Sequence, residues 1–169
     1  AIAGSLILKD GKNYYNRFVF ACPDGKLSFY NKRHLFRMGN EHEHYKAGEE
    51  RVIVSFRGVR FLLQVCYDLR FPVFSRNRND YDAIIYVANW PESRREVWIK
   101  LLQARAIENQ SWVFAVNRVG TDGMGLSYSG DSMLIDYKGN VVNSAKGNEE
   151  QSMLVETDFS EQEAFRKKF

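Results

Sequence analysis

Cys66 is the residue whose type and setting best suit covalent chemistry. It ends the apolar run Phe61–Val65 and is followed at once by Tyr67–Pro72, so a strand has to turn sharply into a helix at the cysteine. Such a turn lifts a nucleophile out of a sheet, and the free backbone N–H groups of the next helix favour a thiolate and an oxyanion. A buried structural cysteine is the other interpretation, because free cysteine is among the most buried residue types.

Lys32 is a second candidate, within the segment Tyr30–Phe36 that directly follows an expected strand. Beside a thiolate, an ammonium group lowers the pKa of the thiol and then donates a hydrogen bond to a developing oxyanion. An ordinary surface lysine fits the local sequence as well, because lysine is rarely buried. The sequence around Lys32 alone favours the surface lysine.

The run Glu41–His44 contains residue types that bind metals, and His34 and Cys66 could add further ligands. Zinc sites usually show paired Cys or His spacings and further groups that hydrogen-bond to the metal ligands. This run establishes neither, so a solvated polar loop is the alternative. A papain-like pairing of Cys66 with one of the three histidines also stays open, although its local cysteine signature is absent. We expect no metal and no cofactor.

The hydrophobic pattern predicts the elements that position these residues. Strands are expected at Ile2–Leu8, as a buried strand, and at Arg17–Ala21, Leu27–Tyr30, Val52–Phe56, Val59–Cys66, Ala83–Ala88, Trp112–Asn117, Met133–Asp136, Val141–Ala145 and Met153–Glu156. Asp10–Lys12 and Pro23–Gly25 have the composition of turns, and Arg57–Gly58 that of a tight hairpin. A glycine-rich segment occupies the region around Gly120–Gly125.

Three helices are expected between and after these strands: Pro72–Arg78, Glu92–Asn109 and Ser160–Phe169. In the longest of them, the residues at helical spacing that line one face are Val97, Leu101, Ala104 and Ile107, with Trp98 and Leu102 widening that face. Hairpins mixed with crossover helices predict an α/β fold with a mixed sheet covered on at least one face.

Composition limits the possible partners. A chain of 169 residues with 44% hydrophobic content predicts one compact domain over residues 1–169. The 24 basic and 21 acidic side chains are interleaved, so we expect no nucleic-acid partner. No apolar run approaches the roughly 20 residues that span a bilayer, and the two cysteines form no disulfide framework, which together favour a cytoplasmic protein.

Several linked motifs resemble the carbon–nitrogen hydrolase (nitrilase) superfamily in their order and spacing. The motifs are Tyr30–Phe36, Glu41 ahead of Ala47–Gly48, Val65–Pro72, Ala88–Pro91, Ala104–Asn109 and Gly130–Ser132, so the similarity covers nearly the whole chain. The resemblance implies a four-layer α-β-β-α sandwich that commonly dimerises, and hence a homodimer. Within the superfamily, Cys66–Phe71 resembles bacterial omega-amidases, which hydrolyse the side-chain amide of 2-oxoglutaramate or 2-oxosuccinamate to a dicarboxylate and ammonia.

The resemblance also implies roles for individual residues. Cys66 is the nucleophile that forms a thioester, while Lys32 and the backbone N–H of Tyr67 stabilise the oxyanion. Glu41 matches a glutamate that positions the substrate and Lys32.

For two further residues, the resemblance implies contacts with the small-molecule amide substrate. Arg70 resembles the residue that grips its carboxylate, for which a planar guanidinium is suited. Trp90 is expected to line the wall of the pocket. A position in the hydrophobic core explains an aromatic residue there equally well.

One part of the family pattern has no match in this chain. The superfamily triad includes a general-base glutamate on a strand before the lysine, but residues 1–31 contain no glutamate. We therefore expect the sequence to be N-terminally truncated or incompletely recorded, and this chain alone to be inactive. Alternatives are another amidase of the superfamily, an N-carbamoyl amino acid hydrolase, or a catalytically impaired binding protein with the same fold.

Overall fold

The computed structural model describes residues 1–168, and its first three strands form a sheet of their own. β1 (Ile2–Asp10), β2 (Asn13–Ala21) and β3 (Leu27–Asn31) pair antiparallel in chain order. The turns between them lie where the sequence predicts them, and their glycines Gly11 and Gly25 adopt positive φ angles of 59° and 84°. β3 leads directly into the segment that carries Lys32.

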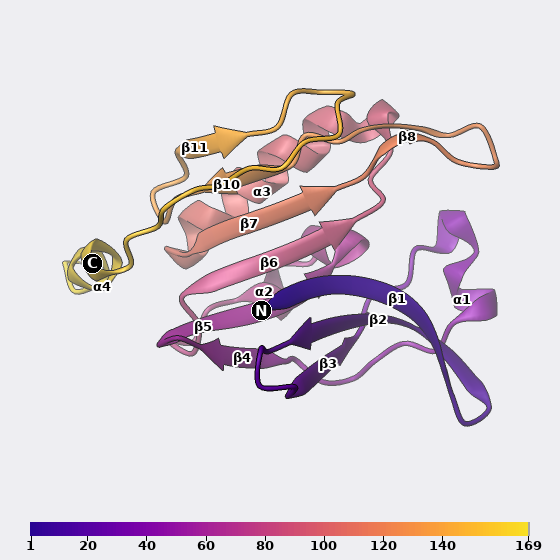
Figure 1. Cartoon of the computed structure of the whole chain (residues 1–169), viewed down its shortest axis with the longest axis horizontal. Helices are drawn as coiled ribbons and strands as arrows, with labels where there is room; N and C mark the ends of the chain where they lie inside the picture. The colour runs from indigo at the N-terminus through magenta and orange to yellow at the C-terminus, as the bar shows by residue number, and fades with distance from the viewer. Residues whose placement is uncertain (169) are drawn as a thin grey trace.

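A second sheet has six strands in the order β11-β10-β7-β6-β5-β4 (Figure 1). These strands are β4 (Ile53–Phe56), β5 (Val59–Val65), β6 (Ala83–Ala88), β7 (Trp112–Asn117), β10 (Met133–Ile135) and β11 (Val141–Ser144). β5, β6 and β7 run parallel, whereas β4, β10 and β11 are antiparallel to their neighbours. The predicted mixed sheet is confirmed, and the carboxyl ends of its three parallel strands meet at one edge.

Short elements and one long helix connect the strands. They are η1 (Arg37–Gly39), α1 (Glu41–His44), η2 (Cys66–Arg70), α2 (Pro72–Ser75), η3 (Glu92–Arg94), α3 (Arg95–Asn109), β8 (Val119–Thr121), β9 (Ser127–Ser129) and α4 (Ser160–Arg166). The hairpin between β4 and β5 has both of its turn residues, Arg57 and Gly58, at positive φ, as a type I′ turn requires. The hairpin β8–β9 lies in the glycine-rich segment, for which no strand was predicted. Phe169, the end of the last expected helix, lies outside the described residues.

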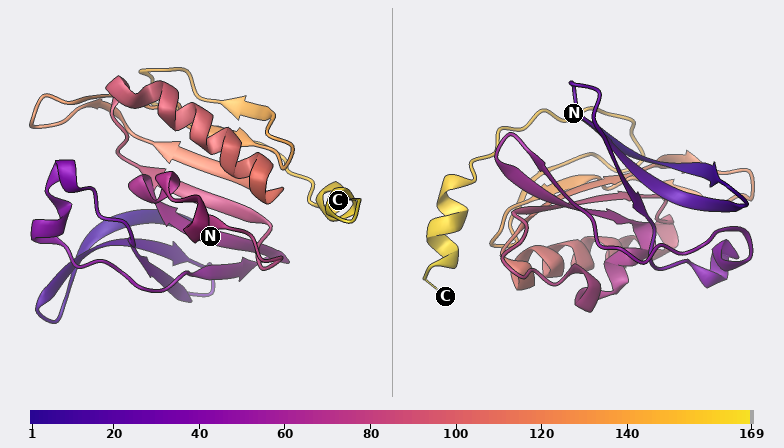
Figure 2. Two further views of the ribbon diagram at one scale, coloured as in Figure 1. Left: turned by 180° about the vertical axis from the view of Figure 1, so that it is seen from behind. Right: turned by 90° about the horizontal axis from the view of Figure 1, so that it is seen from below.

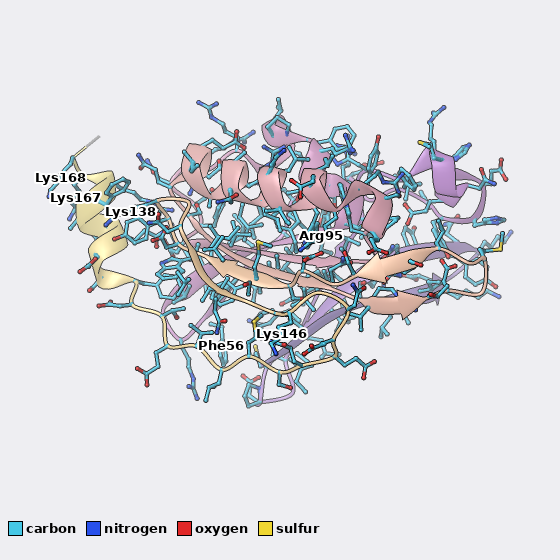
Figure 3. All side chains as sticks on the ribbon, turned by 90° about the horizontal axis from the view of Figure 1, so that it is seen from above. Phe56, Arg95, Lys138, Lys146, Lys167 and Lys168 are labelled. Carbon is cyan, nitrogen blue, oxygen red and sulfur yellow. The ribbon has the colours of Figure 1, made fainter. Side chains whose placement is uncertain are left out.

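The elements form three layers. Phe18, Phe20 and Tyr30 of the three-stranded sheet pack against Leu63 and other residues of one face of the six-stranded sheet. The opposite face packs against α3, as Figures 2 and 3 show from two directions. β5 is buried on both faces, which accounts for its uninterrupted apolar sequence.

The three layers correspond to three of the four in the expected sandwich. Within residues 1–168, no helix covers the outer face of the three-stranded sheet.

β1 is a strand, but the prediction that it is buried was wrong. Ile2 and Leu6 on its outer face are 79% and 58% exposed. β1 pairs only with β2, and its outward side chains face no other layer among the described residues. Hydrophobic content predicts a strand here, whereas burial depends on what packs against it.

Two further predictions need correction. The buried face of α3 is formed by Trp98, Leu102, Arg105, Ala106 and Asn109, whereas Ile107 is 57% exposed. The spacing of Val97, Leu101, Ala104 and Ile107 marks a stripe at one side of the buried face.

The expected strand Met153–Glu156 is absent, because its backbone joins no ladder in the described chain. Val155 packs against a small cluster, while Leu154 is 99% exposed. A short apolar run alone thus did not produce a strand. Among residues 1–168, no helix is long and apolar enough to cross a bilayer.

Candidate active site

Cys66 lies at the strand-to-helix turn that its sequence setting predicts. β5 ends at Val65 and η2 begins at Cys66, whose φ of 47° falls in the left-handed region that residues with a side chain rarely adopt. Such an angle costs about 1–3 kcal/mol and persists only where surrounding contacts impose it. The half-buried thiol donates a hydrogen bond over 3.8 Å to the carbonyl oxygen of Asn89, just past the end of β6. The sulfur is thereby placed at the carboxyl edge of the sheet.

The Asp68 carboxylate holds this turn. It is fully buried and accepts hydrogen bonds from the backbone N–H of Val65 at 3.0 Å and from the hydroxyl of Tyr30 at 2.7 Å. The backbone N–H of His34 and its ring Nδ1 lie 3.0 and 2.8 Å from the other carboxylate oxygen. Tyr30 and His34 flank Lys32 in the sequence. Asp68 therefore ties the Cys66 turn to the segment that carries Lys32.

Lys32 is a buried lysine in an ion pair. Its side chain is 2% exposed, and Nζ lies 2.6 Å from Oε2 of Glu41. The same carboxylate accepts hydrogen bonds from the backbone N–H of Phe36 at 2.7 Å and from the Asn16 side chain at 3.3 Å. Glu41 thus fixes the position of Lys32, and the interpretation of Lys32 as a surface residue is excluded by its burial.

Burial dominates the electrostatics of the thiol. Desolvation raises the pKa of Cys66, the positive charge of Lys32 opposes that rise, and the negative charge of Glu41 adds to it. The net direction is upward, which favours the protonated thiol at neutral pH. Deprotonation of Cys66 therefore calls for a base in addition to the field of Lys32.

Cys66 and Glu41 line two neighbouring cavities. The larger has a volume of about 650 Å³ and is lined by residues of four segments, 36–41, 66–70, 89–94 and 122–128. The smaller has a volume of about 360 Å³ and is lined by residues of β1 and by the ends of β6 and β7. A cavity of about 680 Å³ beneath α4, at the far edge of the molecule, contains none of the candidate residues.

The three other predicted site residues also line the larger cavity. Tyr67 is the second residue of η2, and its ring lies edge-on to Phe36 with centroids 5.1 Å apart. The exposed Arg70 places its guanidinium 5.6 Å from the centre of a Trp90 ring. Trp90 is only 3% exposed and packs against Trp98, so it belongs to the core as well as to the cavity wall.

The alternative interpretations of the histidines find no geometric support. His34 bonds to Asp68 and stacks on Phe71 with ring centroids 3.7 Å apart. In the described part of the chain, no hydrogen bond joins Cys66 to a histidine. Nor do any three His, Cys, Asp or Glu side chains of residues 1–168 group closely enough to hold a metal ion.

Sequence reasoning missed four residues that shape the site: Asp68, Asn89, Phe36 and Arg94. A signal was present for Asn89, because it follows β6 just as Cys66 follows β5, and the carboxyl ends of neighbouring parallel strands meet at one edge. Asp68 had a weaker signal as an acidic residue two positions after the cysteine. The remaining two are brought to the site by tertiary packing alone.

The chain belongs to the carbon–nitrogen hydrolase family, since residues 1–167 match the sequence model of that family. The mixed sheets and the cysteine turn fit this membership. A carbon–nitrogen hydrolase superfamily protein from Xanthomonas campestris, whose crystal structure carries an arsenic adduct in the active site, superposes with a TM-score of 0.96 and 46% identity. The match covers 99% of this chain and 66% of that one.

Two curated relatives are amidases. The chain is 51% identical over 168 residues to omega-amidase YafV of Escherichia coli. That match covers 99% of this chain and 66% of the relative. It is 35% identical over 163 residues to the 2-oxoglutaramate amidase of Bacillus subtilis. That match covers 95% of this chain and 62% of the relative. The chain thus spans slightly less than two thirds of the length of these relatives.

Proposed function

We propose that the protein containing this chain is an amidohydrolase that cleaves the side-chain amide of a small 2-oxo acid, 2-oxoglutaramate or 2-oxosuccinamate, to a dicarboxylate and ammonia. One observation carries the proposal: Cys66, on a strained turn, lines the same cavity as Glu41, the partner of the buried Lys32. The printed names of the amidase relatives support this substrate class.

The proposed reaction has two halves that pass through a thioester. The sulfur of Cys66 attacks the amide carbon while its proton leaves to a base, and Lys32 and the backbone N–H of Tyr67 stabilise the oxyanion. The C–N bond then breaks as the nitrogen takes up a proton, and ammonia departs. Water adds to the thioester, the C–S bond breaks, the thiol regains its proton, and the carboxylate product leaves.

General acid–base catalysis contributes about 10²- to 10⁴-fold to such reactions. The resemblance assigns this step to a glutamate ahead of the lysine, and residues 1–31 contain no glutamate. We therefore assign the proton transfer to no residue of this chain. Glu41 keeps the role of positioning Lys32, to which its 2.6 Å ion pair is suited.

The two free cysteines provide a matched test of the nucleophile. In the full-length protein, Cys66→Ala is expected to abolish ammonia release from 2-oxoglutaramate and to leave the circular dichroism spectrum unchanged. Cys22→Ala, at the other half-buried free cysteine, is expected to retain activity. Amide hydrolysis that survives Cys66→Ala would refute the thioester mechanism.

We further propose a cytoplasmic homodimer. The cytoplasmic location is supported by the free state of both cysteines, because a reducing compartment keeps thiols reduced. The homodimer is supported by the family resemblance. Size-exclusion chromatography with light scattering on the full-length protein tests the dimer.

A further inference from the structure

Within residues 1–168, the carboxylates and the arginines that line the larger cavity form no ion pair with one another. Its two carboxylates are engaged: Glu41 by Lys32, and Asp122 by the Tyr128 hydroxyl at 2.7 Å and two backbone N–H groups. Its two arginines, Arg70 and Arg94, form no ion pair and donate no side-chain hydrogen bond within residues 1–168. The cavity therefore offers two guanidinium groups whose donors are free.

Arg94 is the better fixed of the two. It ends η3, is half-buried, and places its guanidinium 4.9 Å from the centre of the Phe36 ring. Its carbonyl oxygen accepts a hydrogen bond from the Trp90 indole N–H at 2.8 Å. A guanidinium held on an aromatic face loses less freedom when it binds a ligand, and its planar fork matches a carboxylate.

The same contacts link Arg94 to the other parts of the site. Phe36, beneath the Arg94 guanidinium, donates its backbone N–H to the Glu41 carboxylate that holds Lys32. Trp90, which bonds to the Arg94 backbone, is also the ring over which Arg70 lies. The two arginines are thus mounted on the aromatic side chains that line one cavity with Cys66.

The family resemblance already implies a carboxylate contact for Arg70. We propose that Arg94 supplies a second guanidinium to that subsite, so that the two arginines bind a carboxylate group of the substrate remote from the scissile amide. Arg94 then determines specificity: it selects short amides that end in a carboxylate over neutral amides of the same size. This inference rests on the proposed amidase function, because it concerns the occupant of the same cavity. A site built for a charged ligand discriminates strongly between that ligand and an uncharged analogue of the same size, because the analogue leaves the arginines without a partner.

A binding experiment tests the subsite without relying on turnover. Alkylation of Cys66 by iodoacetamide is followed by peptide-resolved mass spectrometry, which separates Cys66 from Cys22, and 2-oxoglutarate is titrated as a protecting ligand. We expect Arg94→Gln to raise the concentration needed for half-protection about 10- to 100-fold, as loss of a charged hydrogen bond implies. Arg94→Lys, which keeps the charge, is expected to lie between Arg94→Gln and the unaltered protein.

Arg57 provides the matched control. Its guanidinium lies 5.5 Å from the Phe56 ring and forms no ion pair among the described residues. It lies in the turn between β4 and β5, and the seven residues of β5 separate that turn from Cys66. Arg57→Gln removes the same charge and should leave protection by 2-oxoglutarate unchanged. If Arg94→Gln is protected as well as the unaltered protein, or if Arg57→Gln weakens protection equally, the subsite is refuted. Equal loss in Arg94→Gln and Arg94→Lys would refute the role of its charge.

The experiment separates failure of this inference from failure of the proposed function. Protection that depends on Arg94, in a protein that hydrolyses no 2-oxo acid amide, would refute the function and support the subsite. Hydrolysis of 2-oxoglutaramate with protection independent of Arg94 would refute the subsite alone. For an active protein, Arg94→Gln should lower kcat/KM for 2-oxoglutaramate mainly through KM, because Arg94 contacts no reacting atom.

Discussion

At the scale of single residues, the site depends on charged groups that are largely shielded from water. Lys32 is 2% exposed, so water screens its charge little, and it is held by Glu41 rather than by a flexible surface partner. Its effect on Cys66 opposes the desolvation that raises the pKa of the thiol. A buried lysine of this kind influences both the resting thiol and a developing oxyanion.

Replacement of Lys32 by Met should shift the alkylation of Cys66 to higher pH. The thiolate is the reactive form, and loss of the positive charge raises the pKa of the thiol further, so the rate at a fixed neutral pH falls. In an active full-length protein, loss of one oxyanion donor should also lower kcat about 10²- to 10³-fold. The pH profile of iodoacetamide incorporation at Cys66 measures the first effect.

Lys100→Met is the control for this substitution. Lys100 is 75% exposed and pairs with Glu96 on the surface of α3. Its loss should therefore leave the pH dependence of Cys66 alkylation unchanged. A profile that stays fixed, or moves to lower pH, in Lys32→Met would show that Lys32 does not lower the pKa of the thiol.

At the scale of elements, the segment after β3 is held in place by close packing of backbone. Gly48 donates its N–H to the carbonyl oxygen of Lys32 at 2.9 Å. A Cβ at Gly48 would lie 2.2 Å from the carbonyl oxygen of Asn31, which is part of the backbone and cannot rotate away. Only glycine allows this approach, which fixes the backbone on both sides of the Lys32 side chain.

Gly48→Ala should therefore lower the free energy of unfolding by about 1–3 kcal/mol, the usual cost of overpacking, and should slow alkylation of Cys66 as Lys32 moves. Urea denaturation followed by tryptophan fluorescence measures the stability. Gly123→Ala is the matched control, since a Cβ at Gly123 meets nothing within 4 Å. Equal stability of the two variants would contradict the close-packing account.

At the scale of the whole molecule, the candidate site and the C-terminal helix lie at opposite edges of the sheet. Lys167 and Lys168, at the end of α4, project from the edge of the molecule opposite α1 (Figure 3). α4 is attached through Gln162 and Arg166, whose side chains donate hydrogen bonds to the backbone carbonyls of Asp82, Gln110 and Tyr81. Phe165 of α4 also packs against Tyr137, with ring centroids 5.2 Å apart, so the attachment is both polar and apolar. It is remote from Cys66.

Arg166→Met should loosen α4, which Gln162 and Phe165 still hold, without disturbing the site. Loss of its hydrogen bonds, at roughly 1 kcal/mol each, should speed hydrogen exchange of the amides of residues 160–166 by at least about tenfold, with alkylation of Cys66 unchanged. Lys167→Met, which removes a 73% exposed charge on the same helix, should alter neither measurement. Changed alkylation of Cys66 in Arg166→Met would show that α4 and the site are coupled.

The sequence by itself determined the strands of the six-stranded sheet, the turn at Cys66, and the candidates Lys32 and Glu41. The strands and the turn follow from hydrophobic periodicity and turn composition. Lys32 and Glu41 were favoured by the order and spacing of the family motifs. Periodicity was less informative for burial, as exposed β1 and Ile107 show, because burial depends on which layer covers a face. The strand predicted at Met153–Glu156 did not form for a related reason: a strand requires a neighbouring strand as hydrogen-bonding partner, and apolar content does not supply one.

Only the tertiary structure decided how the site is assembled. The fully buried Asp68 bonds to residues 34 and 38 positions away, and Arg94 reaches the cavity by lying on Phe36. Such contacts join segments that are distant in the chain, so no local pattern encodes them. The turn at Cys66 fits a buried structural cysteine as well as a nucleophile, and the linked motifs favoured the nucleophile. Its coupling to Lys32, and the two arginines beside it that form no ion pair within residues 1–168, exist only in the folded arrangement.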